Sequence, residues 1–588
     1  MNKLFIVLIT IILSFQGVSQ NPTDSTDQIY TVLDKDSQEP VPYATLYNST
    51  TGTGTVTNLM GQFNWGVLNT RDVLTLSFIG YTSQIFTIKN PIPAIIYLQP
   101  KTEILQSAFV YGNMTFLYHL ISKCKEPRSS KTQLAKTYFT LESKVENQPI
   151  ENLESYYNGY FSGYNCQELK IKTGRLAITN FGDRYFLSLE TSKALNLHHL
   201  FYSGSHFPTS PLGMRKKKLA KFYTLQFVKS YLDDHNHTIY QINYTPKKAC
   251  DDCFHGTLWV DSLQHQIQKA VLITDRTNKH PFAPWANARP LLHVSLEITK
   301  NYNTSAPEVQ FISTDFNYQV KFKANLDSIN DTLLTINTHA LLFAYDYQNT
   351  FKLPLFDFSR ISYRDYSIIG LIPYNPYFWN KYDAFKMGKS KNISNLFLSN
   401  TPGQTGIFIR STNFHTNQFI GHFFGRALTP WGTNRIKMMH GIDGLAPNNT
   451  PIEAPPSQQY HLETQIFMDV NEFNDSLHIT TVSYFDRYES FFYLPQTPNT
   501  DAFVNMYFDL TEIKRRELVK LTKKATSQKQ VEDMYQKGIR DLELQHKSFI
   551  KETQRGYRVK GMKKWNDFIL KRLQIDNVAL FRLLDEDT

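Results

Sequence analysis

The chain has 588 residues, 19% of them charged, and a formal net charge of +10 at pH 7. Its length predicts several domains rather than one. Its 41% hydrophobic and 14% aromatic content excludes a disordered chain, and the 42 Phe and 34 Tyr favour β-rich domains.

The N-terminal segment has the pattern of a secretory signal peptide over residues 1–19. Lys3 supplies a positive charge, Leu4–Phe15 is apolar, and small residues at Gly17–Ser19 precede a polar stretch. The apolar run of about twelve residues is shorter than the roughly 20 that a membrane-spanning helix needs. We therefore expect cleavage near Gln20–Asn21 and export of the mature chain, with an uncleaved anchor as the alternative.

Residues 28–112 contain short strand patterns separated by glycines. β-branched and aromatic residues alternate along Pro40–Asn48, Thr53–Phe63 and Asp72–Tyr81. Three glycines are expected at turns or at close backbone approaches where a Cβ is unfavourable, namely Gly54, Gly61 and Gly80.

The order of these pieces resembles the carboxypeptidase-regulatory-like domain. The matching segments are Pro42-Tyr43-Ala44, then Gly54–Phe63, then Ser77–Tyr81. The resemblance implies a transthyretin-like β-sandwich, which is an accessory domain that contributes no catalytic residue. Such domains stand at the front of many envelope proteins of Gram-negative bacteria. Together with the signal peptide, this implies the periplasm or the outer-membrane periphery, and no nucleic-acid partner is expected.

Residues 133–358 are predicted to form a large antiparallel sheet, curved or closed into a half-barrel. A helix precedes it over Phe116–Cys124, with Leu117, Leu120 and Ile121 on one face. Alternating strands with polar turns follow. The predicted strands include Tyr138–Val145, Arg184–Leu189, Thr238–Tyr244, Gly256–Val260, Ile267–Ile273, Leu291–Ile298 and Thr314–Phe322.

One hairpin in this domain resembles the repeating hairpin of lipoprotein-carrier (LolA-like) curved sheets. It comprises Ile239–Tyr244, then Gly256–Asp261, then Gln266–Lys269. The resemblance implies a concave face that can hold acyl chains, with Trp259 as a binding candidate. We favour the simpler alternative that the apolar side chains fill a core. Those side chains are Leu258, Val260, Ile267, Val271 and Ile273.

Residues 359–508 are predicted to be a mixed β region with aromatic and Gly-rich loops. Pro373–Trp379 is a compact aromatic-proline segment, in which Tyr374, Tyr377 and Trp379 are binding candidates. Strands then follow over His461–Val470 and Ser476–Phe485, and a turn leads into Ser490–Gln496.

Residues 509–588 are predicted to be helical and basic. The expected helices are Asp509–Ala525, a second one with a capping box at Ser527–Gln530, and a last one over Met562–Leu584. Residues 510–572 hold 18 Lys or Arg and 8 Asp or Glu, so the net charge of the chain resides there. A solvated helix face is the expected reason, and contact with an anionic membrane surface is the alternative.

One acidic residue of this region has an expected role. Glu512 should complement the dipole of a helix that starts beside it and should pair with Arg516 at i,i+4.

Four cysteines are present. Cys250 and Cys253 form a lone CxxC in a polar hairpin, for which a turn-closing disulfide is expected, with free thiols or a metal as alternatives. The acidic residues between them would raise a thiol pKa, which disfavours a redox catalyst. Cys124 and Cys166 are left as a candidate second bridge.

Histidines give one candidate site. His461 and Glu463 lie two residues apart, so a strand would place them on one face as metal ligands or an acid–base pair. Exposed strands often carry such residues, and we favour that simpler reason. His235-Asn236-His237 is expected to be a solvated loop. No catalytic residue is assigned and no cofactor is predicted.

These patterns predict a non-enzymatic protein of the cell envelope. In it, the sandwich docks and the β domain binds a partner, which is an envelope protein, a glycan or a lipid. The first alternative is a carrier or binder of lipid or glycan that uses Trp259 or the aromatic segment. The second alternative is a metal-dependent hydrolase at His461 and Glu463.

Overall fold

The computed structural model describes most of the chain. The described residues are 29–50, 53–64, 71–88, 93–102, 115–125, 131–146, 148–179, 198–201, 204–281, 291–303, 308–323, 331–347, 349–358, 365–382, 407–410, 428–432, 435–436, 460–473, 476–492 and 499–583. The predicted signal peptide and the predicted strand Arg184–Leu189 lie outside them. The protein is mainly β with C-terminal helices, as the sequence predicts.

The chain divides into two compact units. One comprises residues 1–100 with 382–388, and the other comprises 101–381 with 389–588. No described helix combines the length and the apolar composition that crossing a membrane requires.

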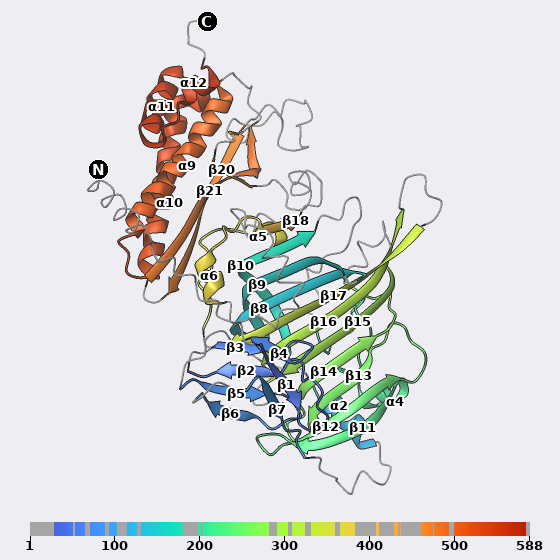
Figure 1. The fold of residues 1–588 in the computed structure, drawn as a ribbon. Coiled ribbons are helices and arrows are strands. Elements are labelled where there is room, and N and C mark those ends of the chain that lie inside the picture. The colour runs from blue at the N-terminus through green and yellow to red at the C-terminus, as the bar shows by residue number, and fades with distance from the viewer. Residues whose placement is uncertain are drawn as a thin grey trace, which may run out of the picture. The chain divides into compact units, whose positions relative to one another are not determined.

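The first unit is a β-sandwich. One sheet has the order β3-β2-β5-β6 and the other has the order β4-β1-β7 (Figure 1). Side chains from both sheets, among them Val32, Leu46, Phe63 and Leu98, form one buried core. The strands are β1 Ile29–Asp34, β2 Thr45–Asn48, β3 Thr53–Val56, β4 Gln62–Asn64, β5 Val73–Ser77, β6 Gln84–Thr87 and β7 Ile95–Leu98.

The three glycines of the sandwich occupy different environments. Gly61 has φ +66°, and a Cβ there would lie 2.5 Å from the carbonyl oxygen of Val32. Gly80 has φ +86°. Gly54 lies inside β3, opposite Tyr47. Gly61 therefore combines a left-handed backbone with a close backbone approach, which only glycine accommodates.

The second unit is built on an open eleven-stranded sheet of order β11-β12-β13-β14-β15-β16-β17-β8-β9-β10-β18. All neighbours are antiparallel except β10 and β18. The strands are β8 Gln133–Val145, β9 Gln148–Ser162, β10 Asn165–Thr179, β11 Tyr223–Leu232, β12 Thr238–Pro246, β13 His255–Asp261, β14 Ile267–Thr274, β15 Leu292–Tyr302, β16 Val309–Lys323, β17 Asp331–Asp346 and β18 Ile407–Arg410. The predicted curved antiparallel sheet is confirmed.

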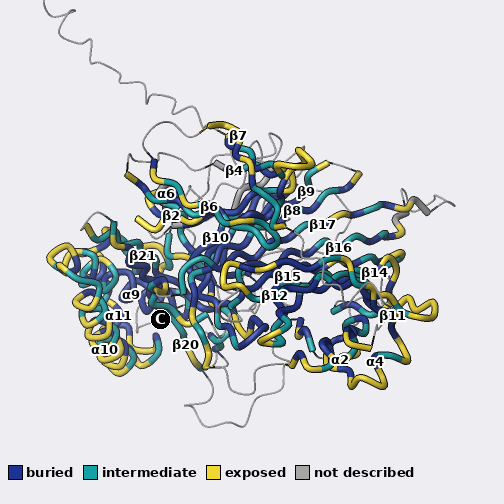
Figure 2. The backbone as a smooth tube through the Cα atoms, turned by 90° about the horizontal axis from the view of Figure 1, so that it is seen from below, coloured by how far each residue is buried: buried dark blue, intermediate teal, exposed yellow. Residues whose placement is uncertain are grey.

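One face of this sheet is apolar and buried beneath short helices. Helix α2, Thr115–Lys123, turns Leu117, Leu120 and Ile121 into the core, as its sequence pattern predicts. Helix α5, Asp365–Ile369, packs on β10 at the other end of the same face, where Ile369 lies against Gly174. The burial along the strands is apparent in Figure 2. Two further helices of this unit are α4 Lys216–Phe222 and α6 Pro376–Lys381.

Two residues predicted for this core lie outside it. Leu258, Val260 and Ile267 are buried, but Val271 and Ile273 are only half-buried. Trp259 pairs with Lys269 and Val260 pairs with Ile267, so Gln268 is an extra residue in β14. Because such a bulge reverses the alternation of faces, Ala270 and Leu272 fill the core instead.

The C-terminal region packs helices on a three-stranded sheet of order β19-β21-β20. Its elements are β19 Leu428–Pro430, β20 Tyr460–Phe473, β21 Ser476–Phe492, α9 Thr500–Thr522, α10 Gln528–Thr553, the short 3₁₀ helix η6 Gln554–Gly556, α11 Val559–Leu573 and α12 Asn577–Phe581. In place of the predicted turn before Ser490, β21 continues through a bulge beside His461.

The two largest differences from the predicted helix boundaries lie in α9 and in the last predicted helix. Helix α9 begins at Thr500 rather than Asp509, because its first turns are buried on every side and show no helical period. The predicted last helix is two helices, separated by a left-handed residue at Gln574 and a new cap at Asp576. Of the predicted capping box, the Ser527 half is present, since its side chain accepts a hydrogen bond from the Gln530 amide, whereas Gln530 Oε1 accepts from the Thr526 amide rather than from Ser527.

Candidate functional site

A polar cluster forms where two hairpin turns of the large sheet meet. The first turn joins β11 to β12 and carries Asp233 and His237, and the second joins β13 to β14 and begins at Asp261. Strands β12 and β13 pair so that Ile239 lies opposite Asp261. This register brings His237, two residues before Ile239, to the carboxylate of the second turn.

Backbone amides fix one oxygen of each carboxylate. Asp233 Oδ1 accepts hydrogen bonds from the amides of His235 at 2.9 Å and His237 at 2.8 Å. Asp261 Oδ1 accepts hydrogen bonds from the two amides that follow in its own turn, those of Leu263 and Gln264. Both carboxylates therefore have a fixed direction, and their second oxygens are available to the cluster.

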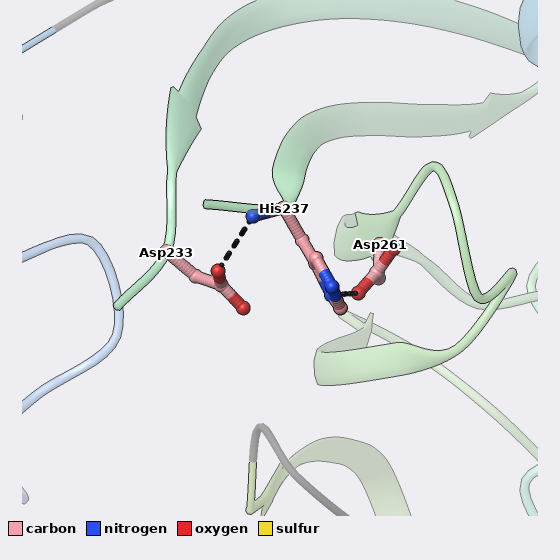
Figure 3. Close-up of side chains that lie close together, drawn as sticks. All are labelled: Asp233, His237 and Asp261. Carbon is pink, nitrogen blue, oxygen red and sulfur yellow. Dashed lines mark hydrogen bonds and ion pairs between the residues drawn. The ribbon is translucent and has the colours of Figure 1, made fainter. Parts of the chain in front are cut away.

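The three side chains converge (Figure 3). His237 Nδ1 lies 2.8 Å from Asp261 Oδ2. One potential ligand atom from each of Asp233, His237 and Asp261 lies within 4.8 Å of the others. Asp261 is only 1% exposed and Asp233 is also buried. An imidazole nitrogen with two carboxylate oxygens is a donor set that suits a divalent transition metal.

The sequence predicts a solvated loop at residues 235–237 and therefore does not indicate this cluster. His237 is largely buried, with one fifth of its side chain exposed. Each Asp stands at the end of a strand and starts a turn, which is a local signal for a carboxylate bound to backbone amides. Only the β12–β13 register shows that these turns meet.

His461 and Glu463 do come together, but on an open strand. His461 Nε2 lies 3.2 Å from Glu463 Oε2, and the His461 side chain is 48% exposed. Within the described part of the chain, no further His, Cys, Asp or Glu joins them in a three-ligand group. The geometry is that of a surface ion pair.

The CxxC turn is closed by a disulfide between Cys250 and Cys253. A shallow pocket of about 260 Å³ lies beside it, lined in part by Lys247, His255 and Arg276.

The candidate bridge between Cys124 and Cys166 is wrong. Both thiols are free and buried. Burial raises the pKa of each to about 12, so neither is a ready nucleophile.

Trp259 does not belong to the apolar face of the large sheet. It alternates with the buried Leu258 and Val260 and therefore points to the opposite side. Its ring lies 4.9 Å from Lys269 Nζ. Burial lowers the pKa of Lys269 to about 8. An acyl chain held on the apolar face would not contact Trp259.

The aromatic segment is mainly packed rather than exposed. Trp379 is buried against Tyr156 of β9 and stacks with Tyr374. The Arg175 guanidinium lies 4.3 Å from the Trp379 ring centre. Tyr377 alone of the three candidates is exposed, beside His478.

Comparison with protein families matches residues 31–110 to the CarboxypepD_reg-like domain. The N-terminal sandwich is a carboxypeptidase-regulatory-like domain. This match covers one part of the chain and assigns no activity to the rest. No curated protein matches the chain.

Two solved structures show a distant likeness to part of the chain. The first is the complex of Pseudomonas aeruginosa MucA and MucB, with 8% identity, a TM-score of 0.14, and coverage of 39% of this chain and 93% of that chain. The second is MucB in complex with MucA(peri), with 8% identity, a TM-score of 0.11, and coverage of 35% and 88%. At these TM-scores the likeness supports no conclusion about fold or function.

Proposed function

We propose that this chain is an exported, non-enzymatic binding protein of a Gram-negative cell envelope. Its carboxypeptidase-regulatory-like sandwich docks on an envelope protein, and its large sheet provides a rigid interaction domain. Domains of the family that the sandwich matches are accessory domains. Docking of the sandwich would place the larger domain beside that partner.

The observation that carries this proposal is an apolar surface on the outer face of the β4-β1-β7 sheet. Ile29 is 45% exposed, Ile95 46% and Tyr97 41%. Ile95 lies opposite Thr31 in the parallel pairing of β1 with β7, so Ile29 and Tyr97 are both its neighbours on that face. Several exposed apolar side chains together on one sheet face are typical of a protein-binding surface.

Two features support export. The N-terminal sequence has the charge, apolar run and small residues of a cleaved signal. The bond between Cys250 and Cys253 belongs in an oxidising compartment, because disulfides persist in the periplasm and are rare in the cytosol.

In-cell photo-crosslinking tests the docking surface. A photoreactive phenylalanine analogue replaces Tyr97 in the full chain, and the same analogue at the exposed turn residue Glu39 is the matched control. We expect a discrete larger species from position 97, enriched in the envelope fraction and absent from position 39. A crosslink confined to this chain, or equal products from both positions, would contradict the proposal.

The basic helices form a separate part of the proposed envelope contact. Lys520, Lys523 and Lys524 are exposed at the end of α9, whereas Arg515 and Arg516 are paired with Glu512. Clustered exposed lysines are attracted to anionic lipid headgroups. Flotation with phosphatidylglycerol vesicles should recover the chain at low salt, and a K520Q/K523Q/K524Q variant should float less.

The other two functions have less support. A hydrolase at His461 and Glu463 would need a further metal ligand, and none of the described His, Cys, Asp or Glu residues supplies one there. A carrier would need room on the apolar face, where Leu258 and Leu272 are fully buried by the protein itself.

A further inference from the structure

A buried side-chain oxygen beside the turn cluster of Asp233, His237 and Asp261 has no hydrogen-bond partner among the described residues. Gln268, the bulged residue of β14, is 2% exposed, yet its Oε1 accepts no hydrogen bond from the described residues. A buried carbonyl oxygen is normally paired with a hydrogen-bond donor or a cation.

The amide of Gln268 faces the cluster. Its Nε2 donates a long hydrogen bond of 3.4 Å to Asp233 Oδ2, longer than the usual range of about 2.7–3.2 Å. A half-turn of this amide exchanges its nitrogen and oxygen with almost no other change. Gln268 Oε1 would then lie about 3.4 Å from Asp233 Oδ2. Two oxygens at this distance repel each other when nothing lies between them. The same distance separates two oxygens that bind one cation.

We propose that Asp233, His237, Asp261 and Gln268 bind one divalent transition-metal ion that joins the β11–β12 and β13–β14 turns. The imidazole favours such an ion over Ca²⁺ or Mg²⁺, which take oxygen ligands. Ligand atoms around zinc lie roughly 3.3–3.5 Å apart. His237 Nδ1 and Asp261 Oδ2 now lie 2.8 Å apart, and the ligand atoms of Asp233, His237 and Asp261 lie within 4.8 Å of one another, so side-chain shifts of about an ångström bring them to this spacing.

The surrounding structure provides the support that metal ligands need. The backbone amides that hold Asp233 Oδ1 and Asp261 Oδ1 fix the carboxylates in place. The ion would also offset the two buried negative charges of Asp233 and Asp261, of which Asp261 contacts the His237 imidazole. The expected role is structural, since the ion would join two hairpin turns of the large sheet.

Metal titration of the full-length mature chain tests this site. After chelator treatment, Zn²⁺ and Mn²⁺ are added and followed by native mass spectrometry and calorimetry. His237→Gln removes the imidazole at a partly exposed position, and His461→Gln is the matched control at the other His–carboxylate contact. Circular dichroism verifies that both variants fold.

We expect one tightly bound Zn²⁺ per chain in the parent and in H461Q. Affinity should fall by roughly 100-fold or more in H237Q, since losing even an outer-shell partner costs 10–100-fold. Ca²⁺ in excess should not displace the zinc. The absence of a tight site in the parent, or equal affinity in H237Q, would overturn the proposal. If H237Q does not fold, zinc-edge X-ray absorption fine structure of the parent decides instead: a coordination shell without the outer-shell scattering of an imidazole ring overturns it.

Discussion

The hairpin turns of the large sheet and the β20–β21 strands each bring a histidine to a carboxylate, and the two contacts differ in kind. At His237 the carboxylate of Asp261 is buried and fixed by two backbone amides. At His461 both side chains are partly exposed, and the two residues come from one strand. Burial and hydrogen bonds from backbone amides therefore distinguish the turn cluster from a surface pair with the same residue types.

Removing one carboxylate from each region should have unequal effects on stability. Asp261→Ala loses the His237 contact and leaves the amides of Leu263 and Gln264 unpaired, so we expect a loss of about 2–3 kcal/mol in the free energy of unfolding. Glu463→Ala should cost about 0.5 kcal/mol or less. Urea unfolding of the chelator-treated chain measures both. Equal losses in the two variants would mean that burial and backbone anchoring do not distinguish the two histidine–carboxylate contacts.

His546 is a third histidine, and its contact is with a tyrosine rather than with a carboxylate. His546 is buried on α10 and stacks on Tyr507. Burial lowers its pKa to about 3, despite the hydrogen bond to the Tyr507 carbonyl, so the folded state keeps it neutral.

Acid should therefore destabilise the helical region through His546. Since the unfolded chain binds this proton more readily, the stability is fully present above the unfolded pKa near 6.5 and is lost as pH falls toward 3. We expect the wild type to lose about 2 kcal/mol between pH 6.5 and 5 through this group, and His546→Gln to lack that loss. Identical pH slopes for the two proteins would contradict it.

Glu512 is an anchored carboxylate in the helical region, as Asp261 is in the hairpin turns. Its side chain is buried and accepts hydrogen bonds from Arg515 and Arg516 at 2.7–2.8 Å. Burial alone would raise its pKa, but these hydrogen bonds outweigh burial and lower it. The predicted pair with Arg516 is confirmed, whereas the predicted dipole role is wrong because α9 starts at Thr500.

Replacing Glu512 by Gln should cost about 1 kcal/mol at neutral pH. Because the folded pKa is lowered, this contribution is present above the unfolded pKa of a Glu and fades as pH falls through the folded value. Denaturation at pH 7 and pH 3 should show a difference between the proteins that shrinks in acid. A difference that grows in acid would exclude the ion pairs as its source.

Local patterns predicted much of the fold. The inward face of α2, the Ser527 cap and the glycine-punctuated sandwich each depend on a few neighbouring residues. The bulge at Gln268 and the buried start of α9 were not predictable, because one depends on strand register and the other shows no period. The sequence predicts a solvated His237 for the same reason, because its partner Asp261 lies on another hairpin.

Anomalous diffraction from crystals of the full chain grown with Zn²⁺ tests the metal site most directly. Data collected on both sides of the zinc absorption edge locate the ion without reference to any variant. We expect one dominant anomalous peak bounded by Asp233, His237 and Asp261, with Gln268 turned to place its oxygen on the ion. A dominant peak at His461 and Glu463, with none between the two hairpin turns, would contradict it.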